Sequence, residues 1–403
     1  MEEWKEYKLG DVISVIKEKT NTSLLDEHTY ISTENMLPNK AGITTSSGVP
    51  SGNAIKFQKG DILVSNIRPY FKKIWQADKT GGCSGDVLCL RASKYIESTY
   101  LYFLLAQDNF FDYVMQGTKG TKMPRGDKNH IMQWPILLPS LAEQRRIASI
   151  LSSLDDKIEL NRKINANLEA QAQALFKSWF VDFEPFKNGE FVESELGMIP
   201  KGWRVCEAQE VFNINIGKTP PRKEPEWFTE SKEDNIWVSI ADMGNCGVFI
   251  SDSSEYLTDE AIKRFNVQMV EKDSILLSFK LTIGRVAIAD TKLTTNEAIA
   301  RFLLPNKSYR EFLYLYLKQY KYGNLGSTSS IATAVNSKTI KGMKLLIPDF
   351  AVIERFSRNA KPLFEQIRNT QQESRRLASL RDTLLPRLMS GELNVFDKPN
   401  DQS

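Results

Sequence analysis

The sequence predicts an α+β protein built as an internal repeat, in which each of two compact domains is followed by one long helix. Three observations lead to this prediction. The chain has 403 residues, more than a single hydrophobic core usually accommodates. The stretch from Leu138 to Ala142 returns as Ile347 to Ala351, a period of about 209 residues, the separation of Leu138 from Ile347. Each copy opens a seven-residue apolar pattern of the kind found in coiled coils. We therefore expect a pseudo-two-fold internal repeat.

The first domain is expected at residues 1–140. This stretch mixes short apolar runs with Gly and Asn turns, a pattern typical of a compact domain with both strands and helices. It ends in the apolar run from Ile136 to Leu138, which suits a buried strand. Its beginning, Trp4 to Val12, resembles Trp203 to Val211 in the second half, which indicates a shared fold.

A long helix is expected at residues 141–184, because no Gly or Pro interrupts the chain between Ser140 and Glu184. Ser140 and Glu143 have the spacing of a capping box, which marks the start of a helix. Two rows of apolar residues recur every seven positions, as expected of a helix that packs against a partner helix. The helix-pair residues are Ile147, Leu151, Leu154, Ile158, Leu168, Leu175 and Trp179, with Ala172 in the same seam.

A linker at residues 185–202 leads to a second domain, expected at residues 203–349. The two domains repeat only loosely in sequence. Lys59 to Leu63, for example, resembles Glu271 to Ile275, with Asp61 opposite Asp273. A shared fold with a divergent surface would produce this pattern.

The second long helix is expected at residues 350–386, and a C-terminal tail at residues 387–403. Pro362 should kink or restart this helix, and Pro386 should end it near Leu385, because proline disrupts the hydrogen bonding of a helix. The helix-pair residues on this helix are Phe356, Leu363, Ile367, Leu377 and Leu384, with Ala360 in the same seam.

Polar residues interrupt the two seams at matching positions. Asn161 and Asn165 in the first seam correspond to Thr370 and Ser374 in the second. Polar residues at one level of a helix pair can fix its register. The alternative is an ordinary gene duplication with two core-buried helices, since heptad-like seams also occur in other helix bundles.

The residue types needed for catalysis or metal binding are sparse. The two histidines, His28 and His130, have no Cys, Asp or Glu neighbour at metal-ligand spacing. Gly217-Lys218-Thr219 resembles the end of a phosphate-binding loop, but Phe212 stands where that motif requires Gly. The sequence therefore predicts no catalytic residue, no metal and no cofactor in this chain.

Composition favours the cytoplasm. The four cysteines include no C-x-x-C pair, and no stretch approaches the roughly 18 consecutive apolar residues that a membrane span requires. The net charge is only +3, because 53 Lys and Arg are nearly balanced by 50 Asp and Glu. A basic surface for nucleic acid must therefore be local.

Several local stretches combine basic residues with Gly, aromatic or hydroxyl side chains, a composition suited to contacts with DNA phosphates and grooves. They lie at residues 68–79 and 117–128 in the first domain, and at residues 217–223, 280–285 and 326–330 in the second. The alternative for each is a solvated loop beside an antiparallel sheet. The candidate DNA-binding residues are Arg68, Tyr70, Lys72, Lys73, Lys119, Lys122, Arg125, Lys128, Lys218, Thr219, Arg222, Lys223, Lys280, Arg285, Thr328 and Ser329.

Motifs along nearly the whole chain resemble one known family, the specificity subunits of type I restriction-modification systems. Leu138 to Asn161 and Leu175 to Phe183 are similar to the family's central conserved helix. Gly217 to Pro220 and Leu277 to Lys280 resemble parts of a target-recognition domain. Leu384 to Leu388 resembles the family's C-terminal conserved tail.

The resemblance implies two tandem target-recognition domains, each reading one half of a split site in double-stranded DNA. Two long antiparallel coiled-coil-like helices would separate these domains. It implies a non-catalytic subunit that positions two modification subunits, which are adenine methyltransferases, and restriction subunits with endonuclease and translocase activity. S-adenosylmethionine, ATP and Mg are then expected only in those partners. The second helix has Val352 to Arg355 where the first has Glu143 to Arg146, so the two docking surfaces need not be equal. The main alternative is a standalone DNA-binding protein that self-associates through its paired helices.

Overall fold

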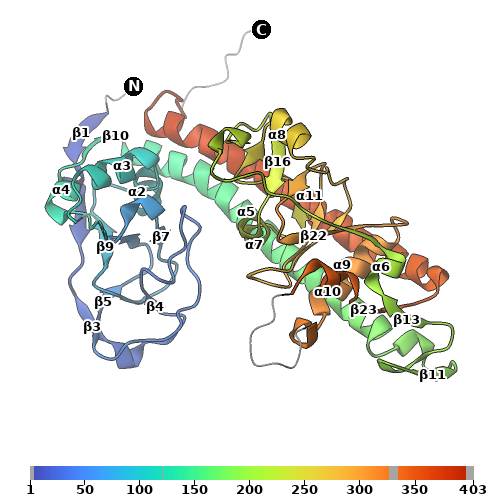
Figure 1. Cartoon of the computed structure of the whole chain (residues 1–403). Coiled ribbons are helices and arrows are strands. Elements are labelled where there is room, and N and C mark those ends of the chain that lie inside the picture. The colour runs from blue at the N-terminus through green and yellow to red at the C-terminus, as the bar shows by residue number, and fades with distance from the viewer. Residues whose placement is uncertain (1–3, 121, 326–334, 396–403) are drawn as a thin grey trace, which may run out of the picture. The chain divides into compact units, whose positions relative to one another are not determined.

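The computed structural model describes residues 4–120, 122–325 and 335–395, and Figure 1 shows its elements along the chain. The described residues form two compact units. Unit 1 holds the residues up to Ile158 together with those from Arg375 onward, and unit 2 runs from Glu159 to Ser374. The helices α5 (Leu141–Phe180) and α11 (Phe350–Met389) each contribute residues to both units. Within the described ranges, every helix lacks the length or the apolar character that spanning a bilayer requires.

The β-structure described for unit 1 consists of two four-stranded sheets and one strand pair. The strands are β1 (Lys5–Lys8), β2 (Ile13–Val15), β3 (Lys19–Asn21), β4 (Tyr30–Ile31), β5 (Asn53–Phe57), β6 (Ile62–Ser65), β7 (Ile74–Gln76), β8 (Gly81–Cys83), β9 (Val87–Ala92) and β10 (Pro135–Leu138). One sheet has the antiparallel order β2-β9-β6-β7, and the other has the order β3-β5-β8-β4 with β4 and β8 parallel. Strand β1 pairs with β10, and the two lie side by side in Figure 1.

Alternating side chains of strand β6 enter two different cores of unit 1. Ile62 and Val64 face the helices, whereas Leu63 faces the β3-β5-β8-β4 sheet, as the period of two along a strand requires. Ile147 and Leu151 of α5 and Leu388 of α11 complete the helix-side core. The helical elements of this unit are α1 (Leu9–Val12), η1 (Thr22–Leu24), η2 (Pro69–Phe71), α2 (Ser98–Leu105), α3 (Asp108–Gln116) and α4 (Lys128–Met132).

Unit 2 repeats this organisation and adds strands. Its strands are β11 (Phe191–Ser194), β12 (Gly197–Pro200), β13 (Arg204–Glu207), β14 (Asn213–Ile216), β15 (Phe228–Thr229), β16 (Asn235–Val238), β17 (Phe249–Ile250), β18 (Tyr256–Leu257), β19 (Ile275–Ser278), β20 (Val286–Ala289), β21 (Thr294–Thr295), β22 (Ile299–Leu303) and β23 (Lys344–Ile347). The order β14-β22-β19-β20-β17 matches β2-β9-β6-β7 of unit 1, with β17 added at one edge. The pair β13-β23 matches β1-β10. A second sheet has the order β15-β18-β16-β21, and β11 and β12 form a separate hairpin.

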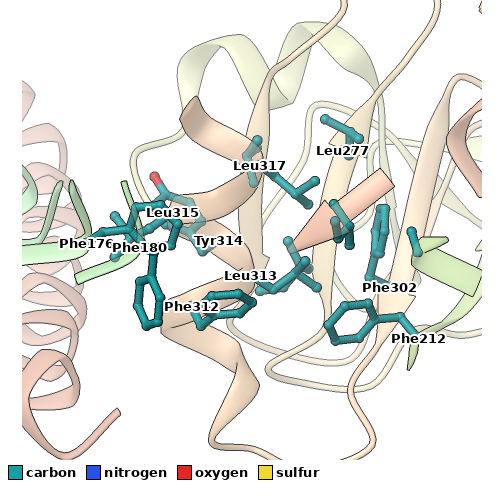
Figure 2. Packing of buried hydrophobic residues seen from close by; sticks show 14 of the residues in the cluster. Phe176, Phe180, Phe212, Leu277, Phe302, Phe312, Leu313, Tyr314, Leu315 and Leu317 are labelled. Carbon is teal, nitrogen blue, oxygen red and sulfur yellow. The ribbon is translucent and has the colours of Figure 1, made fainter. Parts of the chain in front are cut away.

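The shorter helical elements of unit 2 are η3 (Glu184–Phe186), α6 (Ala208–Val211), η4 (Pro225–Trp227), α7 (Ile240–Asn245), α8 (Asp259–Arg264), α9 (Tyr309–Gln319), η5 (Tyr322–Leu325) and α10 (Ser337–Lys341). Among them, α9 contributes the most residues to the core of the unit. Figure 2 shows Phe176 and Phe180 of α5 packed beside Phe312 of α9. The ring centroids of Phe180 and Phe312 are 4.9 Å apart, in the edge-to-face arrangement that aromatic pairs favour.

The residue two positions before the matching strands β6 and β19 has a left-handed backbone in both units. Gly60, before β6, has a φ of 91°, and Asp273, before β19, has a φ of 70°. The amide of Gly60 donates to Ala77 over 2.8 Å, and that of Asp273 donates to Ala289 over 2.8 Å. The structural repeat therefore places Gly60 opposite Asp273, one residue away from the sequence resemblance that set Asp61 opposite Asp273.

The long helices differ from the sequence expectation at their ends. Helix α5 stops at Phe180, before the expected residue 184, and α11 is one helix of 40 residues that passes both prolines and ends at Met389. Pro362 and Pro386 are exposed, as are the residues four positions before them, Arg358 and Asp382. The two carbonyl groups that lose a backbone donor therefore lie at the surface, where water can satisfy them.

Candidate nucleic-acid interface

The β6–β7 connection in unit 1 presents two exposed aromatic side chains between basic residues. Tyr70 and Phe71 lie in η2 and are 46% and 38% exposed, with ring centroids 4.7 Å apart. Arg68 and Lys72, on either side of η2, have φ values of 48° and 50°. Such left-handed backbone is uncommon for residues other than Gly, so this loop has a specific shape.

The loop before α4 joins the β6–β7 loop, which brings the two basic stretches expected in the first domain together. Lys119 and Arg125 form an isolated bridge, with both N–H to O distances at 3.0 Å. The amide of Arg68 donates to the carbonyl of Pro124 over 2.8 Å. The described residues of the stretches 66–73 and 117–128 therefore form one surface, called surface A below.

A third loop that the sequence interpretation missed borders surface A. The amides of Asn39 and Lys40 donate to the carbonyls of Phe71 and Lys72 over 2.8 and 2.9 Å. Asn39 and Lys40 both have positive φ. The turn composition from Pro38 to Gly42 was a signal for a tight loop here, but nothing in it indicated which loop it would meet.

The predicted cations of surface A fall into two groups. Lys72 lies 3.0 Å from Asp108, and Lys73 donates to the carbonyl of Thr33 over 2.6 Å while burial lowers its pKa. The side-chain amines of Lys72 and Lys73 therefore help to fix the position of the β6–β7 loop. The exposed members are Lys119 at 2.5 Å from Asp127, Arg125 at 3.2 Å from Asp86, and Lys122 and Lys128, for which the described residues provide no ion pair. Their ammonium and guanidinium groups are accessible from solvent.

Unit 2 brings two of its predicted stretches to one short segment, Thr295 to Ala298. The amide of Lys218 donates to Thr295 over 2.9 Å, and the amide of Phe279, beside Lys280, donates to Ala298 over 2.9 Å. Thr219 donates its hydroxyl to Glu297 on the same segment. Residues 217–223 and 279–285 are therefore called surface B.

The cations of surface B also divide by their contacts. Arg222 forms a two-pronged ion pair with Glu255 at 2.7 and 2.8 Å, and its guanidinium lies 4.6 Å from the ring of Trp237. This hydrogen bonding, opposed by partial burial, lowers the pKa of Glu255. Arg285 donates to the carbonyl of Ile240 over 2.6 Å. Lys218, Lys223 and Lys280 are exposed.

The hydroxyl-bearing loop of the second domain cannot be placed on surface B. Thr328 and Ser329 lie outside the described residues. The chain that leads to them does reach this surface, since a Cβ added at Gly284 of the β19–β20 connection would lie 3.1 Å from the ring of Tyr322 in η5.

None of the predicted helix-pair residues is exposed. In unit 1, Ile147 and Leu151 are buried, and Leu154, Ile158, Leu377 and Leu384 are partly buried. In unit 2, Trp179, Phe356 and Ile367 are buried, and Leu168, Leu175 and Leu363 are partly buried. An ion pair of 2.7 Å joins Asp155 to Arg381 across the helices in unit 1.

The remaining titratable candidates have structural contacts. His130 stacks on Tyr113 with ring centroids 4.2 Å apart, and its Nε2 lies 3.0 Å from the carbonyl oxygen of Tyr113. Burial raises the pKa of Cys83 to about 12 and that of Cys246 to about 11, so neither thiol is ionised at neutral pH. Within the described ranges, no three His, Cys, Asp or Glu side chains are grouped so that they could hold a metal ion.

Comparison with known proteins shows one consistent similarity. The family model described as the type I restriction modification DNA specificity domain matches residues 1–170 and 200–373. The HindI specificity subunit of Haemophilus influenzae is 27% identical, over 98% of this chain and 100% of that protein. The MjaIX specificity subunit of Methanocaldococcus jannaschii is 33% identical, over 74% of this chain and 70% of that protein. The type I S subunit of M. genitalium shares the fold at 16% identity, with a TM-score of 0.58 and 96% of each chain covered.

Proposed function

The chain belongs to the family of type I restriction-modification DNA specificity subunits, and from this premise we propose that each of its two domains reads one half of a split DNA sequence. As a specificity subunit it recognises DNA and is itself non-catalytic, because in this family the cofactors reside in the modification and restriction subunits. The domain bounds of the proposal are residues 1–140 and 203–349, with long helices at 141–184 and 350–386.

The observation that carries the proposal is that the matching β6–β7 and β19–β20 loops, which contribute to surfaces A and B, make a corresponding contact in both units. In unit 1 the β6–β7 loop meets the loop before α4. In unit 2 the matching β19–β20 loop meets η5, which begins the loop before α10. Two similar surfaces on two repeated folds suit two half-sites. Their different side chains suit different half-site sequences, because base edges are read by individual side chains.

Phosphate contacts are assigned to the exposed cations of each surface. On surface A these are Lys119, Lys122, Arg125 and Lys128, and on surface B they are Lys218, Lys223 and Lys280. Such contacts set the position of the protein on the duplex. Lys72, Lys73 and Arg285 are assigned to shaping the loops, because each has a partner within its own unit and is only partly exposed. Arg222 is assigned with them, because its guanidinium is held by two hydrogen bonds to Glu255 and by the ring of Trp237. Arg68, Tyr70 and Thr219 remain candidates for direct contact, and so do Thr328 and Ser329.

The chain is part of a type I restriction-modification assembly with DNA, and we assign it two modification subunits and the restriction subunits as partners in the cytoplasm. All of the predicted helix-pair residues except Leu154, Ile158 and Leu377 pack into the hydrophobic cores of the two units. The docking surfaces for the modification subunits are therefore placed on the exposed faces of α5 and α11. The standalone alternative predicts a stable dimer of this chain alone in size-exclusion chromatography. Our proposal predicts a larger species only when a modification subunit is added.

The test is an exchange of the first domain within the complete system. Residues 1–140 are replaced by the same region of a related specificity subunit, and the methylated motif is determined by sequencing DNA from cells that carry the system. We expect one half of the motif to change while the other half and the spacing stay. The matched control exchanges residues 203–349 and should change only the opposite half. A change in both halves after a single exchange would contradict the proposal.

A further inference from the structure

The tip of the β19–β20 connection carries a leucine whose side chain is fully exposed in the part of the chain that the structure describes. Leu281 is fully exposed, the most exposed of the large apolar residues in the described chain. Its φ is 59°, in the left-handed region that leucine rarely adopts. Exposure of the side chain and strain of the backbone are both unfavourable in the free protein. A feature of this kind is a reason to look for a function.

Hydrogen bonds hold this tip in one shape. The amide of Thr282 donates to the carbonyl of Lys280 over 2.7 Å, which closes a tight turn around Leu281. The hydroxyl of Ser278, a fully buried residue, donates to the carbonyl of Thr282 over 2.5 Å and accepts from the amide of Arg285 over 3.0 Å. The backbone that carries Leu281 is therefore held in one shape before any partner binds, which lowers the entropy lost on binding.

The surroundings of the tip are basic. Lys280 is the preceding residue, and the loop of Lys218 contacts the same segment, Thr295 to Ala298, as the loop of Leu281. Positive charge around a protruding apolar side chain suits a polyanion better than an apolar protein surface. The matching β6–β7 loop in unit 1 also combines exposed apolar side chains with basic residues and positive φ. Tyr70 and Phe71 are exposed there, between Arg68 and Lys72, which both have a left-handed backbone.

We propose that Leu281 is a specificity-determining residue that contacts the 5-methyl group of a thymine in the major groove of the half-site read by the second domain. This inference rests on the proposed function of the two domains. Leucine has no hydrogen-bonding atom in its side chain, so it cannot read the donors and acceptors of the base edges. The thymine methyl is the apolar group that the major groove presents.

The experiment combines a protein change with a base change. The complex of this chain with its modification subunits is bound to a duplex that carries the methylated motif. Each thymine of the second half-site is replaced in turn by deoxyuridine, which lacks only the methyl. For the wild-type chain we expect one position to weaken binding about fourfold, the value of one buried methyl. For Leu281→Ala we expect binding to the thymine duplex to fall about tenfold. The same deoxyuridine should then have no further effect.

Two further variants separate recognition from folding. Leu281→Gly removes the backbone strain, so its melting temperature should equal or exceed that of the wild type while its affinity falls as in Leu281→Ala. Leu196→Ala is the matched control, because Leu196 is also in unit 2 and is 51% exposed. It should change neither affinity nor the deoxyuridine response.

Several outcomes would overturn the inference. The first is wild-type affinity for Leu281→Gly, and the second is an additive effect of Leu281→Ala and deoxyuridine on affinity. The third is that deoxyuridine weakens binding at no position of the half-site. The fourth is that Leu281→Ala weakens binding to unrelated DNA by the same factor. A leucine wedged between stacked bases would be insensitive to the methyl group, so it would give the third of these. If the domain exchanges change the expected half-sites while the Leu281 variants do nothing, this inference fails and the proposed function stands. If the exchanges do not change them, the proposed function fails first.

Discussion

The side-chain amide of Asn161 on α5 donates a hydrogen bond to the hydroxyl of Ser374 on α11 over 3.2 Å. Asn161 is fully buried, and its amide also lies 2.7 Å from a carboxylate oxygen of Glu373. One turn along α5, Asn165 accepts a hydrogen bond from the hydroxyl of Thr370. The four polar positions that interrupt the apolar seams are therefore joined in one hydrogen-bonded layer, which favours a single register of the helix pair within unit 2.

Removing this amide should destabilise unit 2. For Asn161→Ala we expect the free energy of unfolding to fall by about 1 to 3 kcal/mol, because buried acceptors lose their donor. A cycle with Ser374→Ala should show a coupling of about 0.5 to 1.5 kcal/mol between the two sites. Denaturant unfolding of the four proteins measures both. The control is Asn167→Ala on an exposed face of α5, for which we expect a change within about 0.5 kcal/mol. If Asn161→Ala and Asn167→Ala change the free energy of unfolding equally, the polar layer does not stabilise the helix pair.

Asp273 is the centre of a second, charged network in unit 2. One of its oxygens lies 2.7 Å from Arg310 and 2.6 Å from Arg368, and all three side chains are largely buried. Burial alone would raise the pKa of Asp273, but the hydrogen bonds from the two arginines outweigh it, so the pKa lies below its ordinary value. For Asp273→Asn we expect a loss of about 1 to 3 kcal/mol in the free energy of unfolding at pH 7, because the two arginines lose a shared partner but keep their ion pairs with Glu365.

The pH dependence of the same variant follows from the sign of that shift. A carboxyl whose folded pKa is depressed contributes stability that is fully present above the unfolded value of about 3.9 and is lost as pH falls through the folded pKa. Unfolding measured between pH 7 and pH 3 should therefore show a smaller acid loss for Asp273→Asn than for the wild type. Asp112→Asn, at an exposed acid, should keep the wild-type profile. A wild-type acid profile for Asp273→Asn would contradict this assignment of the shift.

The sequence predicted those features that depend on neighbours along the chain. The rows that contain Ile147 and Phe356 predicted two long helices, and the matching positions of Asn161 and Thr370 predicted the polar layer. Both follow from helical periodicity, which the sequence displays directly. The helix neither restarts at Pro362 nor ends before Pro386, because the effect of a proline depends on whether the carbonyl it disrupts can reach water. That exposure is a property of the folded chain.

Contacts between residues far apart in the chain could not be predicted from the sequence. Arg222 was as good a candidate for DNA contact as Lys223 by composition, yet its guanidinium pairs with Glu255 at a sequence separation of 33 residues. The resemblance that set Asp61 opposite Asp273 was wrong by one residue, because the common feature is a left-handed backbone and not an acidic side chain. A glycine can match an aspartate at such a position.

This division of surface B has a measurable consequence for DNA binding. Lys218→Ala combined with Lys223→Ala should reduce the log-log slope of affinity against salt concentration by about two units, one for each phosphate contact. The melting temperature should stay the same, since both side chains are exposed. Arg222→Ala should leave the slope nearly unchanged and lower the melting temperature, because Glu255 and the ring of Trp237 lose their partner. A slope reduced by about one unit in Arg222→Ala would show that this arginine contacts DNA instead.

The last prediction concerns the spacing between the two half-sites. Helix α5 passes from unit 1 to unit 2 at Ile158, and α11 passes back at Ser374. Inserting four helix-forming residues after each of these two positions lengthens both helical connections and leaves the contacts within each unit unchanged, including the layer around Asn161. Four residues add about 6 Å and restore nearly the same helical face.

Base pairs are spaced by about 3.4 Å, so the double insertion should give a methylated motif with the same two half-sites and a spacer longer by one or two base pairs. Sequencing of methylated DNA from cells with the complete system measures this. The control is the insertion after Ile158 alone, which lengthens α5 but not α11 and so shifts the register of the helix pair. We expect it to lower the melting temperature or to abolish assembly with the modification subunits. If the double insertion is active with the original spacer, the helices act only as a tether, because a rigid separator cannot lengthen without moving the bases that the two domains read.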